Sequence, residues 1–370
     1  MQWSYFIDEI VTLSSFSNAC TGLANANLAL NVNPSYGKLI SAEATFLSHS
    51  ALLNGDKKYQ YVSVEQETNG LVFDLIPLEN RVNVFKVSVV CEHKTFTCNI
   101  AFLPAIDLPH AVFVLGSPRS GTTVVGNMVQ RGLQIKSHGE SHMAELLQNL
   151  VTTVTEYVKG APAATNEGTL TWEVSPTYVK ALQIQQFREL YSTFYTGPVL
   201  IDKTPGEPML NSLSLLFLVY PNAKVVYCKR RGIENVASRM RKFADVPFEG
   251  HCNQWKQAFT IWRRNKRHLN NELLKHKSWF IEVEQFTLLK DAAPLIKQLA
   301  DFLALPESAY VKMLNYQASE TPEKTSDEGG VPKSLVDMNW TNEQKQRFEE
   351  ICGTEMERAG YSLTEHYFNH

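Results

Sequence analysis

The sequence predicts an α/β protein in which a parallel sheet is flanked by helices, preceded by a β-rich, sandwich-like domain. Short apolar runs alternate with helical periodicity after residue 110, and such alternation builds a parallel sheet covered by helices. Strand-like segments broken by turn residues fill the first 105 residues. We therefore expect a β-rich domain at 1–105 and an α/β domain at 110–370, joined by a linker at Pro104–Pro109.

Strands are predicted in the N-terminal part wherever β-branched and aromatic residues cluster, at Tyr59–Glu65, Gly70–Ile76 and Val82–Cys91. Apolar and polar residues alternate from Thr95 to Phe102, which is typical of a half-buried strand. Glu92–Thr95 would then form a hairpin turn. The sequence leaves the role of this part open between acceptor binding, oligomerisation and packing against the second domain.

Four short apolar segments of the second part predict buried strands: Ala111–Leu115, Val199–Ile201, Lys224–Cys228 and Ser278–Val283. Thr341-x-x-Gln344 is a capping box that should open the last helix, which ends near Arg358. Ligands of such parallel sheets bind beyond the carboxyl ends of the strands.

Composition excludes several classes of protein. A net charge of −3 over 370 residues argues against general nucleic-acid binding, which needs a basic surface. No apolar run approaches the roughly 18 residues of a membrane span. Asp8 and Glu9 stand where a secretory leader would be apolar. The six cysteines include no Cys-x-x-Cys pair. We expect a cytoplasmic protein with reduced thiols and no metal site.

A candidate anion cradle follows the first of these strands. Gly116-Ser-Pro-Arg-Ser-Gly-Thr-Thr123 combines a glycine-containing turn with a helix start, where successive backbone N–H groups bind phosphate. Its spacing equals that of the Walker A loop, but Thr122 stands in place of the lysine that an NTPase needs. Arg119 can instead grip a phosphate or sulfonate bidentately without a metal.

The Pro-Arg-Ser-Gly-Thr-Thr segment resembles the 5′-phosphosulfate loop of PAPS-dependent sulfotransferases, especially tyrosylprotein, bacterial and carbohydrate-type enzymes. The resemblance implies a P-loop NTPase-like fold, PAPS (3′-phosphoadenosine 5′-phosphosulfate) as co-substrate and adenosine 3′,5′-bisphosphate as product, with no metal required. It assigns the following loop residues to the nucleotide: Ser117, Arg119, Ser120, Gly121, Thr122 and Thr123.

A second segment, Pro221–Arg239, is similar to the 3′-phosphate segment of that family. A strand there ends in arginine, and the next helix supplies a serine eight positions later; here these are Arg230 and Ser238. A 3′-phosphate needs a positive charge and a directional hydroxyl donor. The family commonly has an acidic residue or Asn after the arginine, whereas this chain has Arg231. The sequence therefore leaves open which of Lys229, Arg230 and Arg231 meets the phosphate.

Leu200-Ile-Asp-Lys-Thr-Pro205 resembles the Glu/Asp-Lys-Thr-Pro strand end of the family. The resemblance places Lys203 at the reacting centre, where its charge would neutralise oxygen charge developing between phosphorus and sulfur; Arg119 would assist. Gly329-Gly-Val-Pro-Lys333 is loosely comparable with the loop that closes over PAPS in the cytosolic enzymes, which makes Lys333 a candidate lid contact.

A general base must take the proton of the acceptor. Gly139-Glu140 resembles the segment that carries the catalytic glutamate of tyrosylprotein sulfotransferases, so Glu140 is the favoured base. His138 and His142 are alternatives, because the cytosolic branch uses a histidine. A base elsewhere, such as Glu145 or Glu173, also stays open.

The sequence thus predicts sulfonate transfer from PAPS to a hydroxyl, or an amine, of a small metabolite or sugar, without nucleic-acid or membrane partners. A P-loop kinase or nucleotide-binding protein is the first alternative, and Thr122 argues against it. A non-catalytic binding module led by the β-rich domain is the second. The acceptor, homo-oligomer formation and the aromatic that stacks on adenine stay open. Trp255 and Trp262 suit core packing at least as well as stacking.

Overall fold

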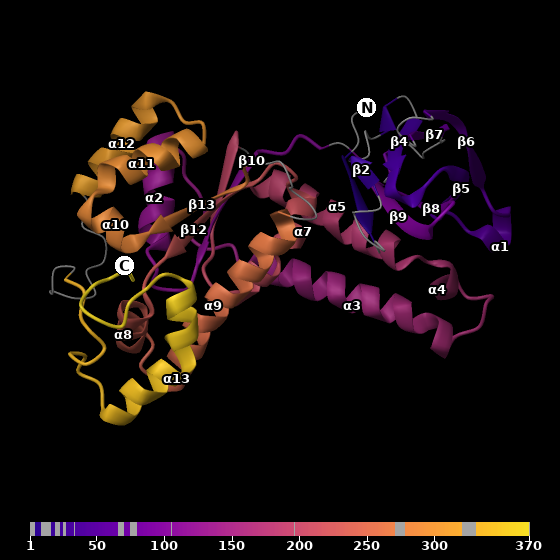
Figure 1. Cartoon of the computed structure of the whole chain (residues 1–370). Helices are drawn as coiled ribbons and strands as arrows, with labels where there is room; N and C mark the ends of the chain where they lie inside the picture. Colours follow the sequence, from indigo (N-terminus) through magenta and orange to yellow (C-terminus); the bar gives the residue numbers. More distant parts are fainter. Residues whose placement is uncertain are drawn as a thin grey trace. The chain divides into compact units, whose positions relative to one another are not determined.

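The structure is a computed structural model of the 370-residue chain. It describes residues 4–8, 16–18, 23–24, 27–32, 34–65, 70–74, 80–104, 106–195, 197–270, 278–319 and 331–369 (Figure 1). The chain divides into two compact units. The N-terminal unit comprises residues 1–108 and 146–194, and the C-terminal unit comprises 109–145 and 195–370. Residues 146–194 therefore group with the N-terminal strands, a grouping that the sequence pattern does not predict.

The described strands of the N-terminal unit form an antiparallel sheet in the order β1-β9-β8-β5-β6-β7-β4-β2, with β3 paired to β4. The strands are β1 (Ser4–Asp8), β2 (Phe16–Asn18), β3 (Leu23–Ala24), β4 (Asn27–Val32), β5 (Leu39–Phe46), β6 (Lys58–Glu65), β7 (Gly70–Asp74), β8 (Asn83–Cys91) and β9 (Thr95–Leu103). The predicted strands before the linker and the hairpin turn at 92–95 are confirmed. Residues 75 and 76 of the predicted third segment lie outside the described residues.

This sheet buries one continuous apolar cluster, which includes Phe46, Phe73, Phe85 and Phe102. The helices of the unit are α1 (Ala51–Asn54), α4 (Leu170–Glu173), α5 (Pro176–Phe194) and α3 (Met143–Ala164), whose residues from 146 on belong here. A buried hydrogen bond of 3.0 Å from Asn99 Nδ2 to Thr177 Oγ1 holds α5 against β9.

The C-terminal unit contains a four-stranded parallel sheet in the order β11-β10-β12-β13. Its strands are β10 (His110–Gly116), β11 (Val199–Lys203), β12 (Lys224–Lys229) and β13 (Phe280–Glu284). All four coincide with the segments that the apolar runs predict. The predicted fold class, a parallel sheet flanked by helices with a β-rich N-terminal part, is therefore confirmed.

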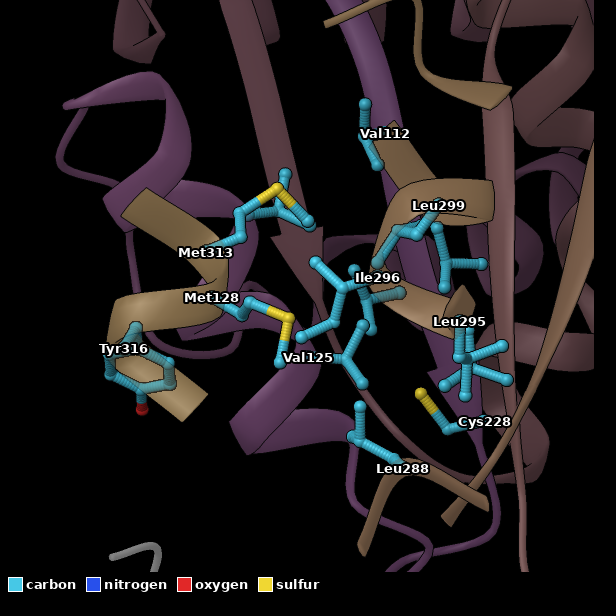
Figure 2. Packing of buried hydrophobic residues seen from close by; sticks show 14 of the residues in the cluster. Val112, Val125, Met128, Cys228, Leu288, Leu295, Ile296, Leu299, Met313 and Tyr316 are labelled. Atoms are coloured by element: carbon cyan, nitrogen blue, oxygen red, sulfur yellow. The ribbon is translucent and has the colours of Figure 1, made fainter. Parts of the chain in front are cut away.

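Helices cover this sheet and bury its apolar residues. They are α2 (Thr122–Leu133), α6 (Glu207–Asn211), α7 (Leu213–Val219), α8 (Gly232–Lys242), α9 (Phe248–His268), α10 (Gln285–Lys290), α11 (Ala292–Phe302), α12 (Glu307–Ser319) and α13 (Asn342–Arg358). Figure 2 shows Val125 and Met128 of α2 beside Ile296 of α11 and Met313 of α12, in the cluster that also contains Val112 of β10. This packing fixes the start of α2 at the end of β10.

The C-terminal segment after α13 is tied to the end of β13 by a buried carboxyl group. The hydroxyls of Tyr361 and Tyr367 donate hydrogen bonds of 2.5 and 2.8 Å to Glu284. Burial raises the pKa of Glu284 to about 7, although both hydrogen bonds oppose the shift. The predicted capping box of α13 is confirmed, with both reciprocal hydrogen bonds between Thr341 and Gln344 present.

Glu284→Gln should change how stability depends on pH. Because the pKa of Glu284 is raised in the folded state, the folded protein binds a proton between about pH 4.5 and 7 that the unfolded chain releases. As the pH rises through this window, the free energy of unfolding of the wild type should therefore fall relative to that of the variant, by at most roughly 3 kcal/mol. Urea unfolding of both proteins at pH 5, 6, 7 and 8 measures this difference. A difference that is independent of pH would contradict the prediction.

Candidate active site

The carboxyl ends of the four parallel strands place four site segments along one edge of the sheet. Lys203 of β11 lies opposite Val114 of β10, two residues before the phosphate loop (residues 116–123). Lys229 of β12 lies opposite Glu284 of β13. Since all four strands are parallel, the loops that follow them begin at the same edge of the sheet, where parallel sheets bind ligands.

The phosphate loop has a backbone that only a few residue types adopt. A β-carbon at Gly116 (φ +152°) would lie 2.5 Å from the carbonyl oxygen of Cys228 on the neighbouring strand, so glycine is required there. Gly121 (φ +92°) precedes the first turn of α2. Arg119 has a left-handed backbone with φ of 73°, a conformation that costs a non-glycine residue about 1–3 kcal/mol. The surrounding structure must therefore hold Arg119 in place.

Asn235 of α8 supplies that support. Its Nδ2 donates hydrogen bonds of 3.1 Å to the carbonyl oxygen of Pro118 and to Ser120 Oγ, and Ser117 Oγ lies 3.5 Å from its Oδ1. All three loop contacts are buried or half-buried. The sequence prediction does not include Asn235, although it lies inside the segment that resembles the 3′-phosphate motif.

Of the predicted loop residues, the side chains of Ser117, Ser120 and Thr122 are buried, whereas Thr123 is exposed. Buried hydroxyls at a helix start give an anion directional donors, in addition to backbone N–H groups.

The phosphate loop and the predicted 3′-phosphate corner are contiguous. Arg119 Nε donates a hydrogen bond of 3.3 Å to Ser238 Oγ, and Arg230 Nη1 donates one of 3.0 Å to the carbonyl oxygen of Arg119. Trp255 Nε1 fixes the Arg230 backbone through its carbonyl oxygen at 3.0 Å. Burial lowers the pKa of Arg230, and the charge of Arg119 lowers it further. Two guanidinium groups brought together in this way favour an anion between them.

The structure separates the three consecutive basic residues at this corner. Lys229 pairs with Glu282 at 3.0 Å. Arg231 is fully buried and pairs with Glu234. Only Arg230 reaches the phosphate loop among the described contacts, and its Nε has no hydrogen-bond partner in the described part of the chain.

Lys333 comes to the same corner through its backbone. Its carbonyl oxygen accepts a hydrogen bond of 2.7 Å from Arg231 Nη2, while its residue as a whole is exposed. Residues 329 and 330 of the predicted closing loop lie outside the described residues.

Lys203 and Glu140 form a direct ion pair. Lys203 Nζ lies 2.7 Å from Glu140 Oε1, and His142 Nε2 lies 3.3 Å from Glu140 Oε2. The Lys203 side chain is 10% exposed and that of Glu140 is 36% exposed. Gly126 of α2 makes room for the lysine, because a β-carbon there would lie 3.0 Å from Lys203 Cγ. The structure thus brings the predicted base and the predicted cation together.

A second carboxylate holds the Glu140 segment in place. Asp202 accepts hydrogen bonds from Ser141 Oγ at 2.5 Å and from Thr204 Oγ1 at 2.7 Å. The backbone N–H of Ser141 in turn donates to Thr204 Oγ1 at 3.1 Å. Burial raises the pKa of Asp202. Asp202 therefore acts as a positioning residue that fixes the residues beside Glu140 and Lys203.

The other candidate bases have different partners among the described residues. His138 packs edge-on against Tyr195, with ring centroids 5.0 Å apart. Glu145 is exposed in the first turn of α3. Glu173 belongs to the N-terminal unit, where it accepts hydrogen bonds from Ser50 Oγ and the Leu52 N–H, which lower its pKa.

Both tryptophans considered for adenine stacking are buried in the core. Trp255 packs against Phe259 with ring centroids 4.7 Å apart, and Trp262 stacks on Tyr227 at 4.2 Å. Neither ring presents a face to a ligand.

Within the described ranges, no helix has the length and apolar character of a membrane span. No group of three or more potential metal-ligating side chains gathers among these same residues.

Comparison with solved structures finds sulfotransferases. The chain is 18% identical to the sulfotransferase domain from the curacin biosynthetic pathway, covering 66% of this chain and 97% of that one with a TM-score of 0.39. It is 15% identical to the sulfotransferase domain of the Synechococcus PCC 7002 olefin synthase, covering 68% and 96% with a TM-score of 0.41. It is 11% identical to sulfotransferase STF9 from Mycobacterium avium, covering 68% and 77% with a TM-score of 0.41.

The chain is also similar to an "uncharacterized protein" of Aquifex aeolicus (strain VF5), with 23% identity over 312 residues. The match covers 82% of this chain and 39% of the relative, so the chain spans less than half the length of that protein.

A family model described as the sulfotransferase family matches residues 109–309. This range contains the phosphate loop, Glu140, Lys203 and the Arg230 corner. Because the match covers more than half of the 370 residues, the chain belongs to the sulfotransferase family.

Proposed function

We propose that this protein transfers the sulfonate of PAPS to a hydroxyl, or an amine, of an acceptor. The observation that carries the proposal is the contact of Arg230 and Ser238 with Arg119 of the phosphate loop. One nucleotide with phosphate groups at both its 5′ and 3′ ends matches two contiguous cationic sites better than a triphosphate chain does. Thr122 in place of the Walker lysine supports the same choice, since a kinase would need that lysine.

Two groups of residues would bind the two phosphate ends of the nucleotide. Backbone N–H groups at the start of α2, with Ser117, Ser120 and Arg119, would hold the 5′-phosphosulfate. Arg230 and Ser238 would hold the 3′-phosphate. Sulfonate transfer forms a bond from the acceptor oxygen to sulfur and breaks the bond from sulfur to the bridging oxygen, which leaves with adenosine 3′,5′-bisphosphate.

Glu140 and Lys203 would serve the two ends of this displacement. Glu140 would take the proton of the acceptor as general base, and Lys203 would stabilise the negative charge that develops on the leaving oxygen. The attacking and leaving oxygens lie on opposite sides of the sulfur, so the 2.7 Å ion pair would open when the acceptor and the nucleotide bind between the two side chains. His142, at 3.3 Å from Glu140, could then receive the proton or orient the carboxylate.

The acceptor class is a separate part of the proposal. We propose a small metabolite or sugar as acceptor, with no metal taking part in the transfer. The N-terminal unit would contribute to acceptor binding, to oligomerisation or to packing against the second domain.

Glu140→Gln should lower sulfonate transfer by about 10²–10⁴-fold, the usual contribution of a general base, while adenosine 3′,5′-bisphosphate still binds. The assay incubates sulfur-labelled PAPS with a small-molecule extract of host cells and follows the label into new products. Glu349→Gln, which neutralises an exposed carboxylate on α13, is the matched control and should retain full transfer.

Retained transfer in Glu140→Gln would move the base to His142 or His138. Loss of bisphosphate binding together with transfer would mean that Glu140 supports the nucleotide site rather than the chemical step. Absence of label transfer and of bisphosphate binding in the wild type would contradict the proposed function as a whole.

A further inference from the structure

A second buried guanidinium lies next to the nucleotide corner and takes no part in it. Arg239 of α8 is 2% exposed. Among the described residues, neither its Nε nor its Nη1 has a hydrogen-bond partner. Buried N–H groups that lack an acceptor are costly, and those of a charged group cost the most. These two donors are therefore available to an acceptor that the described residues do not supply.

The carboxylate whose charge acts on Arg239, that of Glu207, does not meet this need by contact. Burial lowers the pKa of Arg239 to about 10, and the charge of Glu207 on α6 partly opposes this shift. The two side chains nevertheless form no ion pair in the described part of the chain. Glu207 has another partner. In the orientation that satisfies its hydrogen bonds, the side-chain amide of Gln257 donates to both carboxylate oxygens, at 2.5 and 3.0 Å. The charge of Arg239 is thus balanced by Glu207 without a contact, while its Nε and Nη1 have no acceptor among the described residues.

Two further side chains interact with the guanidinium. Phe243 lies with its ring centroid 5.5 Å from the Arg239 guanidinium carbon. His251 of α9 is 1% exposed, and its Nδ1 has no partner among the described residues. Burial lowers the pKa of His251, and the charge of Arg239 lowers it further, so the neutral ring is favoured. The combination of a flat cation, an aromatic wall and a neutral imidazole suits an oxygen anion.

The chain segments that carry this cluster are connected to both parts of the proposed nucleotide site. Arg239 directly follows Ser238, and Glu207 comes four residues after Lys203. The N–H of Gly206 donates to the carbonyl oxygen of Gly116 at 2.9 Å. At the other end of α6, Ser212 Oγ donates to the carbonyl oxygen of Ala144 at 2.9 Å, close in sequence to Glu140. The chain that carries Glu207 therefore runs between the phosphate loop and the Glu140 segment.

We propose that Arg239, together with His251, binds an anionic group of the acceptor, a carboxylate or a phosphate. The inference rests on the proposed function, since it names the class of acceptor for the same site. An acceptor fixed through this group would lie against α8 and α9, which carry Arg239 and His251. A buried arginine that recognises a planar or tetrahedral oxyanion also rejects neutral analogues, because they leave its donors unpaired.

The first test measures anion binding without knowledge of the acceptor. The protein is saturated with adenosine 3′,5′-bisphosphate, which blocks the phosphate loop, and sodium acetate or inorganic phosphate is added at constant ionic strength. The wild type should show a saturable rise in Tm, because a ligand that binds only the folded state stabilises it. The anion with the lower half-saturating concentration identifies the carboxylate or the phosphate class.

Arg239→Gln should raise the half-saturating concentration by about tenfold or more, the loss expected for a charge-assisted hydrogen-bond pair. Arg241→Gln removes the same charge from an exposed position of the same helix and should respond like the wild type. Should Arg239→Gln fail to fold, Arg239→Lys keeps the charge but loses the planar donor set, and it should show a weakened response. An equal response in all variants, or no saturable response in the wild type, would mean that water alone satisfies Arg239.

The second test identifies the acceptor itself. Products that receive labelled sulfonate from PAPS in the cell extract are separated, and their charge is determined after removal of the sulfonate. The proposal predicts an acceptor that still carries a carboxylate or phosphate. A neutral acceptor would overturn this inference and leave the sulfotransferase function intact, whereas lack of bisphosphate binding would overturn that function first.

Discussion

A single buried guanidinium, that of Arg231, determines the shape of the nucleotide corner. It donates hydrogen bonds to Glu234 and to backbone carbonyls of Lys333, Ser362, Thr364 and His366. A buried charge is tolerated only when its donors are satisfied, so this residue binds the C-terminal segment to the turn between β12 and α8. Tyr367 adds to the same attachment, because its hydroxyl accepts from the Arg231 N–H at 2.8 Å and donates to Glu284. The neighbouring Arg230 is thereby left to face the phosphate loop.

The reacting end of the site depends on a comparable arrangement around β11. Asp202, Lys203 and Thr204 follow one another at the end of this strand, and each contacts the segment that carries Glu140. Asp202 holds that segment through Ser141, and Lys203 pairs with the carboxylate itself. The geometry of the pair is therefore set by a strand end and by a loop more than 60 residues earlier in the chain.

Much of this architecture could be predicted from the sequence, because its signals are local. Apolar runs locate the four parallel strands, and Thr341 with Gln344 marks the start of α13. The phosphate loop combines a strand, a glycine turn and a helix start within a few residues. The resemblance to the sulfotransferase family supplied the candidate roles of Glu140, Lys203 and Arg230, and the family itself is confirmed.

Features that depend on long-range contacts could not be read from the sequence. In the sequence, Lys229, Arg230 and Arg231 are three adjacent cations with nothing to rank them. Arg231 is set apart by its hydrogen bonds to carbonyl groups more than 100 residues away in the chain. Asn235 was missed because its loop partners lie 115 to 118 residues earlier. The grouping of residues 146–194 with the N-terminal sheet was missed because helical periodicity does not say which sheet a helix covers. The unpaired donors of Arg239 likewise depend on where Glu207 and Gln257 lie.

The central claim is that this corner holds a nucleotide through its 3′-phosphate without a metal. Calorimetric titration in EDTA of adenosine 3′,5′-bisphosphate and adenosine 5′-monophosphate tests it most directly. The account predicts that the bisphosphate binds about tenfold or more tightly than the monophosphate, and that Arg230→Gln removes this advantage. Equal affinities for the two nucleotides, or binding that appears only for ATP with Mg²⁺, would contradict it.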